Sequence, residues 1–271
     1  RVFVNRLWRL FYGHGLSRNL EDCGAQGEAP DHPELLDWLA VEFIDSGWNV
    51  RHMIRQMVLS QTYRQASGHA ETDPENRLLA RQSRWRFDAE VIRDNALAVS
   101  GLLNREVGGR SVKPYQPGGY YRFLNFPKRD YKSDAGSSQY RRGLYTHWQR
   151  AYLHPMLKAF DAPSREECTC ERPQSNTPLS ALVLLNDPTF VEAARAFAAR
   201  ILREGGTSND ERVRWAWRES LSRLPTDREH AALIKLLEAE RRAIKDHPEL
   251  TSKLLTVGQA AAPPEIDQTE L

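Results

Sequence analysis

Residues 176–202 read NTPLSALVLLNDPTFVEAARAFAARIL and contain two helix starts in succession. Thr177 and Asp187 each precede a proline, which is the pattern of a side-chain cap followed by Pro at the first helical position. The first start predicts a helix that buries LSALVLL and ends at Asn186-Asp187-Pro188. The second predicts a helix that runs through FVEAARAFAARIL to Gly205. This stretch therefore indicates a mainly α-helical fold.

Other segments carry similar helix signals. Asn49 is placed to cap VRHMIRQMVLSQTYRQ, and Ser208 with Glu211 and Thr226 with Glu229 fit the capping box. Asp73-Pro74 also predicts a helix start. The pentapeptide DHPEL occurs at residues 31–35 and 246–250, where the pattern predicts an Asp cap, Pro in the first turn and Glu reaching back. Because the pentapeptide occurs at two predicted helix starts, we interpret it as a helix-start signal, and we do not expect His247 to take part in catalysis.

The segment from Asp88, DAEVIRDNALAVSGLL, predicts a further helix. Its apolar residues recur at helical spacing and are expected to form the buried stripe. That stripe contains Val91, Ile92, Val99, Leu102 and Leu103.

Length and composition limit the class of protein. The chain has 271 residues, is 40% hydrophobic and carries a formal charge of +2, so it is globular and can form one large domain or two small ones. Its longest uncharged apolar stretch, residues 95–104, is about half of what a bilayer span needs. The chain opens on Arg1 inside an amphipathic pattern, and we expect it to be a fragment of a longer protein.

Residues 110–150, the basic-aromatic segment, differ from the rest. They hold nine Lys or Arg against two Asp, together with nine aromatic residues, and their Pro and Gly disfavour long helices. Aromatic faces and Arg forks suit sugars that carry sulfate or carboxylate groups. The alternative is that these aromatic residues line a core between two helical halves while the Arg residues pair with acids. The last part, QYRRGLYTHW, is expected to be a short strand or an extended segment.

Motifs of known chemistry are absent from the sequence. No nucleophile elbow, phosphate-binding glycine loop or zinc-protease motif is present. Cys168 and Cys170 form a lone C-x-C, which does not supply the four ligands of structural zinc, so we expect no metal site. With Cys23 as the third cysteine, at most one disulfide can form, and Cys23 has to be one end of it. Asp22 and Asp161 could act as general acid or base near a sugar, and both also suit turns.

Eight segments in fixed order resemble the PSD-one domain of unknown function, the C-terminal module of large planctomycete cytochrome c-like proteins. They are RVFVNRLW, GHGL, LEDCGAQGEAPDHPELLDWLA, SQTYRQAS, DPENRLLARQSRWRFDAEVIRD, YRRGLYTHW, FDAPSREEC and SNTPLSALVLLNDPTFVEAAR. The resemblance covers residues 1–258, read as one helical domain of two halves around the basic-aromatic segment with at most a few short strands. Residues 259–271 are then a linker or the truncated lead-in to a further helix.

The resemblance implies a periplasmic or extracellular module whose partners are upstream domains of the same polypeptide. It implies no cofactor in this segment, because haem c would belong to a separate upstream domain. Genes of the family often lie near genes for polysaccharide-degrading and sulfatase-like proteins, which implies an anionic polysaccharide as ligand. Export and a charge near zero both argue against nucleic acid as a partner.

These points lead to a hypothesis in which the chain binds or processes a sulfated or uronic polysaccharide. Asp22, His32 and Asp161 are the candidate acid and base. The candidate ligand contacts are Arg6, Arg64, Arg141, Arg142, Trp148, Arg165 and Asn176. The alternative is a non-catalytic docking or scaffold domain for a cytochrome domain in electron transfer, and the sequence leaves open whether the module is an enzyme.

Overall fold

The computed structural model describes residues 1–22, 24–68, 73–124, 128–150, 152–263 and 266. Ten α-helices, two 3₁₀ helices and three isolated β-bridges lie in these ranges, which contain no sheet, so the predicted mainly α class is confirmed. The helices are α1 (Val2–Tyr12), α2 (Pro33–Asp45), α3 (Val50–Leu59), α4 (Ala89–Ser100), α5 (Pro155–Ala159), α6 (Pro178–Asn186), α7 (Pro188–Glu204), α8 (Asn209–Leu221), α9 (Asp227–Asp246) and α10 (Pro248–Leu255). Over the same ranges, no helix combines the length and apolarity that crossing a membrane requires.

The chain forms two compact units, which are described separately. The N-terminal unit contains residues 1–86 and 168–171, and the C-terminal unit contains residues 87–167 and 172–271. The expectation that residues 1–258 form one domain stays a prediction.

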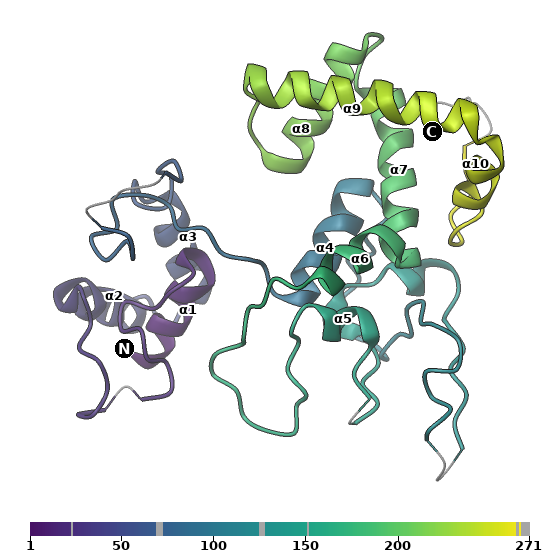
Figure 1. The fold of residues 1–271 in the computed structure, drawn as a ribbon. Coiled ribbons are helices and arrows are strands. Elements are labelled where there is room, and N and C mark those ends of the chain that lie inside the picture. Colours follow the sequence, from purple (N-terminus) through teal and green to yellow (C-terminus); the bar gives the residue numbers. More distant parts are fainter. Residues whose placement is uncertain (23, 69–72, 125–127, 151, 264–265, 267–271) are drawn as a thin grey trace. The chain divides into compact units, whose positions relative to one another are not determined.

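In the N-terminal unit, α1, α2 and α3 pack around one apolar cluster (Figure 1). Trp8 and Tyr12 of α1 stack with ring centroids 3.8 Å apart, and the Tyr12 hydroxyl donates to the Met57 carbonyl of α3 at 3.1 Å. Buried Asn5 exchanges hydrogen bonds with the backbone of Ser17, which fixes the chain that follows α1. The apolar faces of three short helices thereby share one core.

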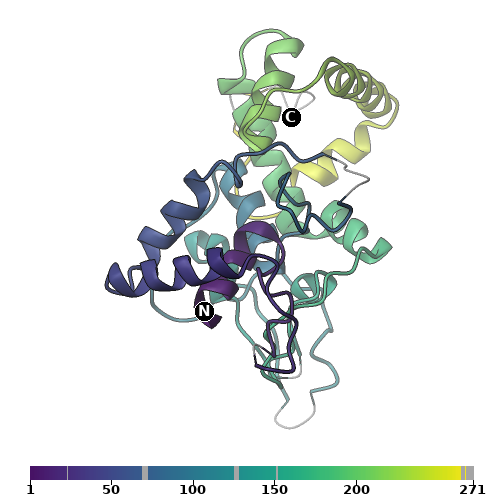
Figure 2. The same ribbon diagram turned by 90° about the vertical axis from the view of Figure 1, so that its left-hand side faces the viewer.

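In the C-terminal unit, α4 packs along α7, and the two helices lie side by side in both views (Figures 1 and 2). A second apolar cluster joins Ala89 of α4, Leu157 of α5 and Phe190 of α7. Helices α8 and α9 pack against each other, and α8 also contacts α7.

Most of the predicted helix caps are confirmed. Asn49, Thr177 and Asp187 accept hydrogen bonds from backbone N–H groups in the first turns of α3, α6 and α7, respectively. Both capping boxes are present, at Ser208 with α8 and at Thr226 with α9. These caps depend only on neighbouring residues, which explains why the sequence identifies them.

Two predicted helix starts are wrong in detail. Asp73 begins a turn in place of a helix, because its carboxylate accepts the N–H groups of Arg77 and Leu78. In both DHPEL copies Pro opens the helix as predicted, but the N-cap is His32 or His247 in place of Asp, and neither makes a side-chain cap hydrogen bond. Asp31 pairs with Arg77 in place of capping α2.

The predicted stripe of α4 is also wrong. Helix α4 ends at Ser100, with Gly101 in the left-handed conformation, and its buried residues are Ala89, Arg93, Leu97 and Ser100. Val91, which was expected to be buried, is 46% exposed. Arg93 is fully buried, because it donates to the carbonyls of Gln139 and Arg141. The buried face of α4 therefore shares no residue with the predicted stripe, and a charged residue lies at its centre.

Helix α6 has the predicted bounds but not the predicted burial. Its leucines are exposed: Leu179, Leu182, Leu184 and Leu185. Ser180 is the buried residue of this helix, and its hydroxyl donates to the Ala159 carbonyl at 2.9 Å.

The basic-aromatic segment forms part of the interior of the C-terminal unit. Tyr121 is 6% exposed and meets Tyr131 edge-to-face at 5.3 Å, and the Tyr131 hydroxyl donates to the Pro114 carbonyl at 2.6 Å. Its last part, residues 139–148, holds the end of the 3₁₀ helix Gly136–Tyr140, the 3₁₀ helix Gly143–Tyr145 and isolated bridges at Arg141 and Thr146. Of the two expected forms, a short strand or an extended segment, the short strand is wrong. The interpretation of this segment as core-lining is closer to the structure than that of an open groove.

Candidate functional site

The predicted acid and base residues of the N-terminal unit make local structural contacts. Asp22 accepts the Gly24 N–H at 3.0 Å and donates its own N–H to the Asn19 side chain, which is the hydrogen bonding of a turn. His32 Nε2 lies 2.8 Å from the Arg77 carbonyl. Cys23, beside Asp22, lies outside the described residues, and Cys168 and Cys170 are free thiols.

The third predicted acid, Asp161, belongs to the C-terminal unit. It has a φ of 58°, and its carboxylate accepts the Ser175 N–H at 2.8 Å and the Ser175 hydroxyl. Asp161 therefore closes the loop between α5 and α6 by binding both groups of one serine.

Arg141 binds the backbone of its own unit. Its Nη1 donates to the Arg110 carbonyl at 2.8 Å, and its Nη2 donates to the carbonyls of Glu106 and Gly108. Its guanidinium lies 3.9 Å from the centroid of the Tyr145 ring. Since the side chain is 95% buried within these contacts, it organises residues 106–110 and presents little surface to a ligand.

The other predicted ligand contacts are more exposed. Arg142 pairs with Asp94 at 3.3 Å, and the Arg165 guanidinium lies 3.7 Å from the Trp148 ring centroid and covers one face of that ring. Asn176 is exposed just before α6.

In the N-terminal unit, Arg6 Nη2 donates to Cys170 Sγ at 3.1 Å, and Arg64 is exposed. The predicted set is thus divided between the units, with Arg6, Asp22, His32 and Arg64 in one and the other six residues in the second. Their assignment to a ligand stays a prediction.

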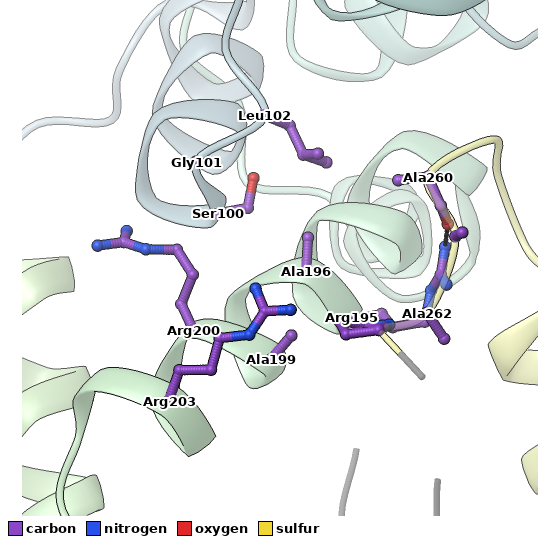
Figure 3. A pocket seen from close by; sticks show the side chains of 12 residues that line it. Ser100, Gly101, Leu102, Arg195, Ala196, Ala199, Arg200, Arg203, Ala260 and Ala262 are labelled. Atoms are coloured by element: carbon purple, nitrogen blue, oxygen red, sulfur yellow. Dashed lines mark hydrogen bonds between the residues drawn. The ribbon is translucent and has the colours of Figure 1, made fainter. Parts of the chain in front are cut away.

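A pocket of about 550 Å³ lies beside α7 in the C-terminal unit (Figure 3). One side comes from the end of α4, the floor from α7, and the opposite side from the chain after α10 (Figure 3). The lining residues are Ser100, Gly101, Leu102, Arg195, Ala196, Ala199, Arg200, Arg203, Ala260, Ala261, Ala262 and Pro263.

Arg195 is the most buried arginine of this pocket, with 8% exposure. Its Nη2 donates to the carbonyls of Val257 (3.0 Å) and Ala260 (2.5 Å). Its Nε is buried and has no hydrogen-bond partner within the described residues. In that same part of the chain no carboxylate forms an ion pair with Arg195. Arg93 and Arg141 also have a buried Nε without a partner, but of these three arginines Arg195 is the one that lines the pocket, where a bound acceptor would be stabilised.

Arg200 is matched more closely by its neighbours. It pairs with Glu204 at 2.9 Å, donates to the Val99 carbonyl at 2.5 Å and lies 5.2 Å from the Trp215 ring centroid. The Glu204 carboxylate raises the pKa of Arg200, so its positive charge is secure. Figure 3 shows the third arginine, Arg203, extending from the floor of the pocket toward Ser100.

The lining chemistry favours anion binding over proton transfer. Three arginines line the pocket, and its twelve lining residues in the described part of the chain include no carboxylate, imidazole or thiol. The one hydroxyl, of Ser100, donates to the Leu97 carbonyl at 3.0 Å. Guanidinium groups stay protonated and bind carboxylate, sulfate and phosphate through paired N–H groups.

The sequence prediction missed this pocket because its walls come from segments far apart in the chain. A local signal was nevertheless present in AARAFAARILR, where alanines separate Arg195, Arg200 and Arg203. Ala196 and Ala199 leave open the space that larger side chains would fill, and the arginines border that space. Elsewhere in the described part of the chain, no group of three or more His, Cys, Asp or Glu could hold a metal ion.

A scan against protein-family models matches residues 1–237 to PSD1, described as "Protein of unknown function (DUF1553)". Searches of curated proteins and of solved structures find no match.

Proposed function

Because the chain belongs to the PSD1 family of proteins of unknown function, we propose its function from the geometry of its sites: it binds an anionic, sulfated or uronic, polysaccharide through the pocket beside α7. The observation that carries the proposal is the meeting of three arginines at one pocket whose described lining holds no acid. A sulfate or carboxylate group is the ligand chemistry that such a pocket stabilises.

The size and the remaining lining suit a sugar. A volume of about 550 Å³ falls within the range of small-molecule sites, roughly 300–1,000 Å³. Ala196, Ala199, Leu102 and Pro263 supply apolar surface for the C–H faces of a sugar ring, beside the guanidinium groups that would hold its charged substituents. The pocket thus combines an apolar floor with arginine side chains in its lining.

The proposal is a binding function, because the pocket lining within the described residues offers no group poised to donate or abstract a proton at neutral pH. Its setting follows the family resemblance: a periplasmic or extracellular module, joined to upstream domains that include a haem-binding cytochrome-like domain, with no cofactor of its own. In that setting the module would hold the polysaccharide while other domains act.

Binding of a sulfated oligosaccharide and of its unsulfated counterpart, measured by calorimetry at low salt, tests the proposal. Arg200→Gln and Arg203→Gln should each weaken binding about tenfold, since hydrogen bonds to charged groups contribute about 1.5–3 kcal/mol and 1.4 kcal/mol is tenfold. Arg228→Gln, an exposed arginine of α9, is the matched control and should change binding less than about twofold.

Arg142→Gln separates this pocket from the surface that the sequence predicted. Loss of binding in Arg142→Gln with retention in Arg200→Gln and Arg203→Gln would move the site to the basic-aromatic segment. Equal binding of the sulfated and unsulfated sugars, or none of either, would reject the anionic-polysaccharide function.

A second candidate function, docking of a cytochrome-like domain, is favoured by an apolar surface on the N-terminal unit. Phe3, Val41, Ile44 and Trp48 are 47%, 55%, 55% and 65% exposed, and Phe3 and Trp48 both contact the ring of Phe43. Contiguous exposed apolar residues often mark protein interfaces. Ile44→Ser with Trp48→Ser should then abolish co-elution with the upstream domain while sugar binding persists, and unchanged co-elution would reject this candidate.

A further inference from the structure

One wall of the pocket is a short segment, residues 257–263, that follows α10; we name it the strap. Its residues Ala260 to Pro263 line the pocket. Two side chains of α7 bind its backbone: Arg195, whose bond to Ala260 is drawn in Figure 3, and Glu192. Whatever holds the strap therefore also completes the pocket.

Glu192 holds the N–H groups of the strap. It is 1% exposed, and its Oε1 accepts the Gln259 N–H at 2.6 Å, the Ala260 N–H at 2.5 Å and the Tyr140 hydroxyl at 2.8 Å. A carboxylate removed from water to this degree is tolerable only when such donors surround it. Two of these three donors are N–H groups of the strap, so the docked strap supplies most of the hydrogen bonds that stabilise the buried charge of Glu192.

Arg195 holds the carbonyl groups of the same segment. It lies one turn after Glu192 on α7 and donates to the carbonyls of Val257 and Ala260. The Glu192 carboxylate therefore binds N–H groups of the strap, and the Arg195 guanidinium binds its carbonyl groups. Undocking the strap would remove the partners of both charges together, which favours two discrete states over gradual movement.

Gly258 shows how closely the strap approaches Glu192. Its φ is +86°, and a Cβ placed on it would lie 2.2 Å from the carboxyl carbon of Glu192. Any side chain at this position has to displace either the strap or the carboxylate. The Gln259 side chain adds a third anchor, because it accepts the Gly136 N–H at 2.9 Å and donates to the Asp134 carbonyl at 3.0 Å.

We propose that the strap is a switch for the anion pocket: its docking on Glu192 and Arg195 completes the site, and its release abolishes binding. This inference rests on the proposed function, because it names the regulation of the same pocket. Glu192 is then a positioning residue, which acts on the ligand through Ala260 and Arg195. By linkage, a bound sulfated sugar stabilises the docked strap to the same extent that docking strengthens binding.

Gly258→Ala tests the switch, with Gly119→Ala as its matched control. Gly119 also has a positive φ, +75°, but a Cβ there meets nothing within 4 Å, so it reproduces the backbone strain without the clash. In the full chain, Gly258→Ala should raise hydrogen–deuterium exchange in residues 257–263 and weaken binding of the sulfated oligosaccharide at least tenfold. Exchange in α4 and α7 should stay as in the wild type, and Gly119→Ala should change neither readout for the strap.

Gln259→Ala provides a milder variant, because it removes the anchor to residues 134 and 136 without any clash. It should increase exchange of the strap and weaken binding less than Gly258→Ala does. Adding the sulfated oligosaccharide to the wild type should slow exchange in residues 257–263.

The outcomes separate the two proposals. If the wild type binds no sulfated sugar, the proposed function fails and the switch fails with it. If the wild type binds and Gly258→Ala binds equally well although its strap exchanges faster, the switch is overturned and the function stands. Unchanged exchange of the strap in both Gly258→Ala and Gln259→Ala would also overturn the switch.

Discussion

Replacing Arg93 with methionine should destabilise the C-terminal unit strongly. The Arg93 side chain is fully buried, and its guanidinium donates to the carbonyls of Arg141 (2.5 Å) and Gln139 (2.7 Å). Burial lowers the pKa of Arg93 to about 10, which still leaves the group charged at neutral pH. Methionine has a similar length and no donor, so the substitution leaves two buried carbonyls without these partners.

The magnitude follows from those two contacts. Each buried acceptor left unsatisfied costs about 1–3 kcal/mol, so the pair costs about 2–6 kcal/mol. Part of this cost is offset, because the methionine variant does not have to bury a positive charge. Apolar replacements of buried charges can be stabilising by about 1–4 kcal/mol. The loss of positive charge near Asp187, whose carboxyl pKa is raised by burial, acts in the destabilising direction. The midpoints of the two ranges, about 4 and about 2.5 kcal/mol, leave about 1.5 kcal/mol, and the effect on Asp187 adds to it, so we expect a net loss of about 2 kcal/mol.

Urea unfolding followed by circular dichroism measures this loss. Arg142→Gln is the control, because Arg142 is exposed and its ion pair with Asp94 should contribute at most about 1 kcal/mol. A loss below about 1 kcal/mol for Arg93→Met, or one no larger than that of Arg142→Gln, would refute the reasoning that Arg93 holds residues 139–141 in place.

Two further predictions concern stability. Burial lowers the pKa of His154 to about 4, from an ordinary value near 6.5. The unfolded state then binds the proton first, so the contribution of His154 to stability is present above about pH 6.5 and is lost as the pH falls toward 4, by about 1.4 kcal/mol per pH unit. His154→Gln should reduce the difference in unfolding free energy between pH 7 and pH 5, and an unchanged difference would contradict this account. Thr177→Ala removes the acceptor of the Ser180 N–H at the start of α6 and should cost about 1 kcal/mol in urea unfolding, whereas the exposed Thr169→Ala should cost almost nothing.

The sequence predicted the helix caps and helix bounds that depend on residues close to one another in the chain. The caps at Asn49, Thr177 and Asp187 are each made by a side chain within three residues of the N–H group that it binds, so their patterns are visible in the sequence. Helix α7 follows from such a pattern and ends one residue before the predicted Gly205. Where two local partners compete the pattern fails, as at Asp73, whose carboxylate binds a turn in place of a helix start.

The sequence could not predict contacts between distant segments. The buried face of α4 centres on Arg93, and its acceptors lie 46 and 48 residues away. The pocket beside α7 requires the end of α4 and the strap as well as Arg195, and only the arginines and alanines of α7 were visible as a local pattern. A prediction that places charged residues on the solvent-exposed face of a helix finds neither the buried Arg93 nor the pocket beside α7.

The use of arginine in this fold connects these observations. The chain has 31 Arg and 7 Lys, and a fold without a sheet in its described part leaves many loop carbonyls to be satisfied by side chains. Arg93 donates to two carbonyls in the last part of the basic-aromatic segment, and Arg141 donates to carbonyls at and just before its start. A planar fork with five donors can bind several carbonyls in this way, and an ammonium cannot do so as well.

Two of the arginines in and beside that segment are therefore structural, which weakens composition as an argument for a ligand there. Arg195 likewise donates to backbone carbonyls, because its Nη2 binds the strap. Its Nε is buried and has no partner within the described residues, as is also true of the Nε atoms of Arg93 and Arg141. What distinguishes Arg195 from these structural arginines is its position in the lining of a pocket, and that position makes α7 the better place to look for an anionic ligand.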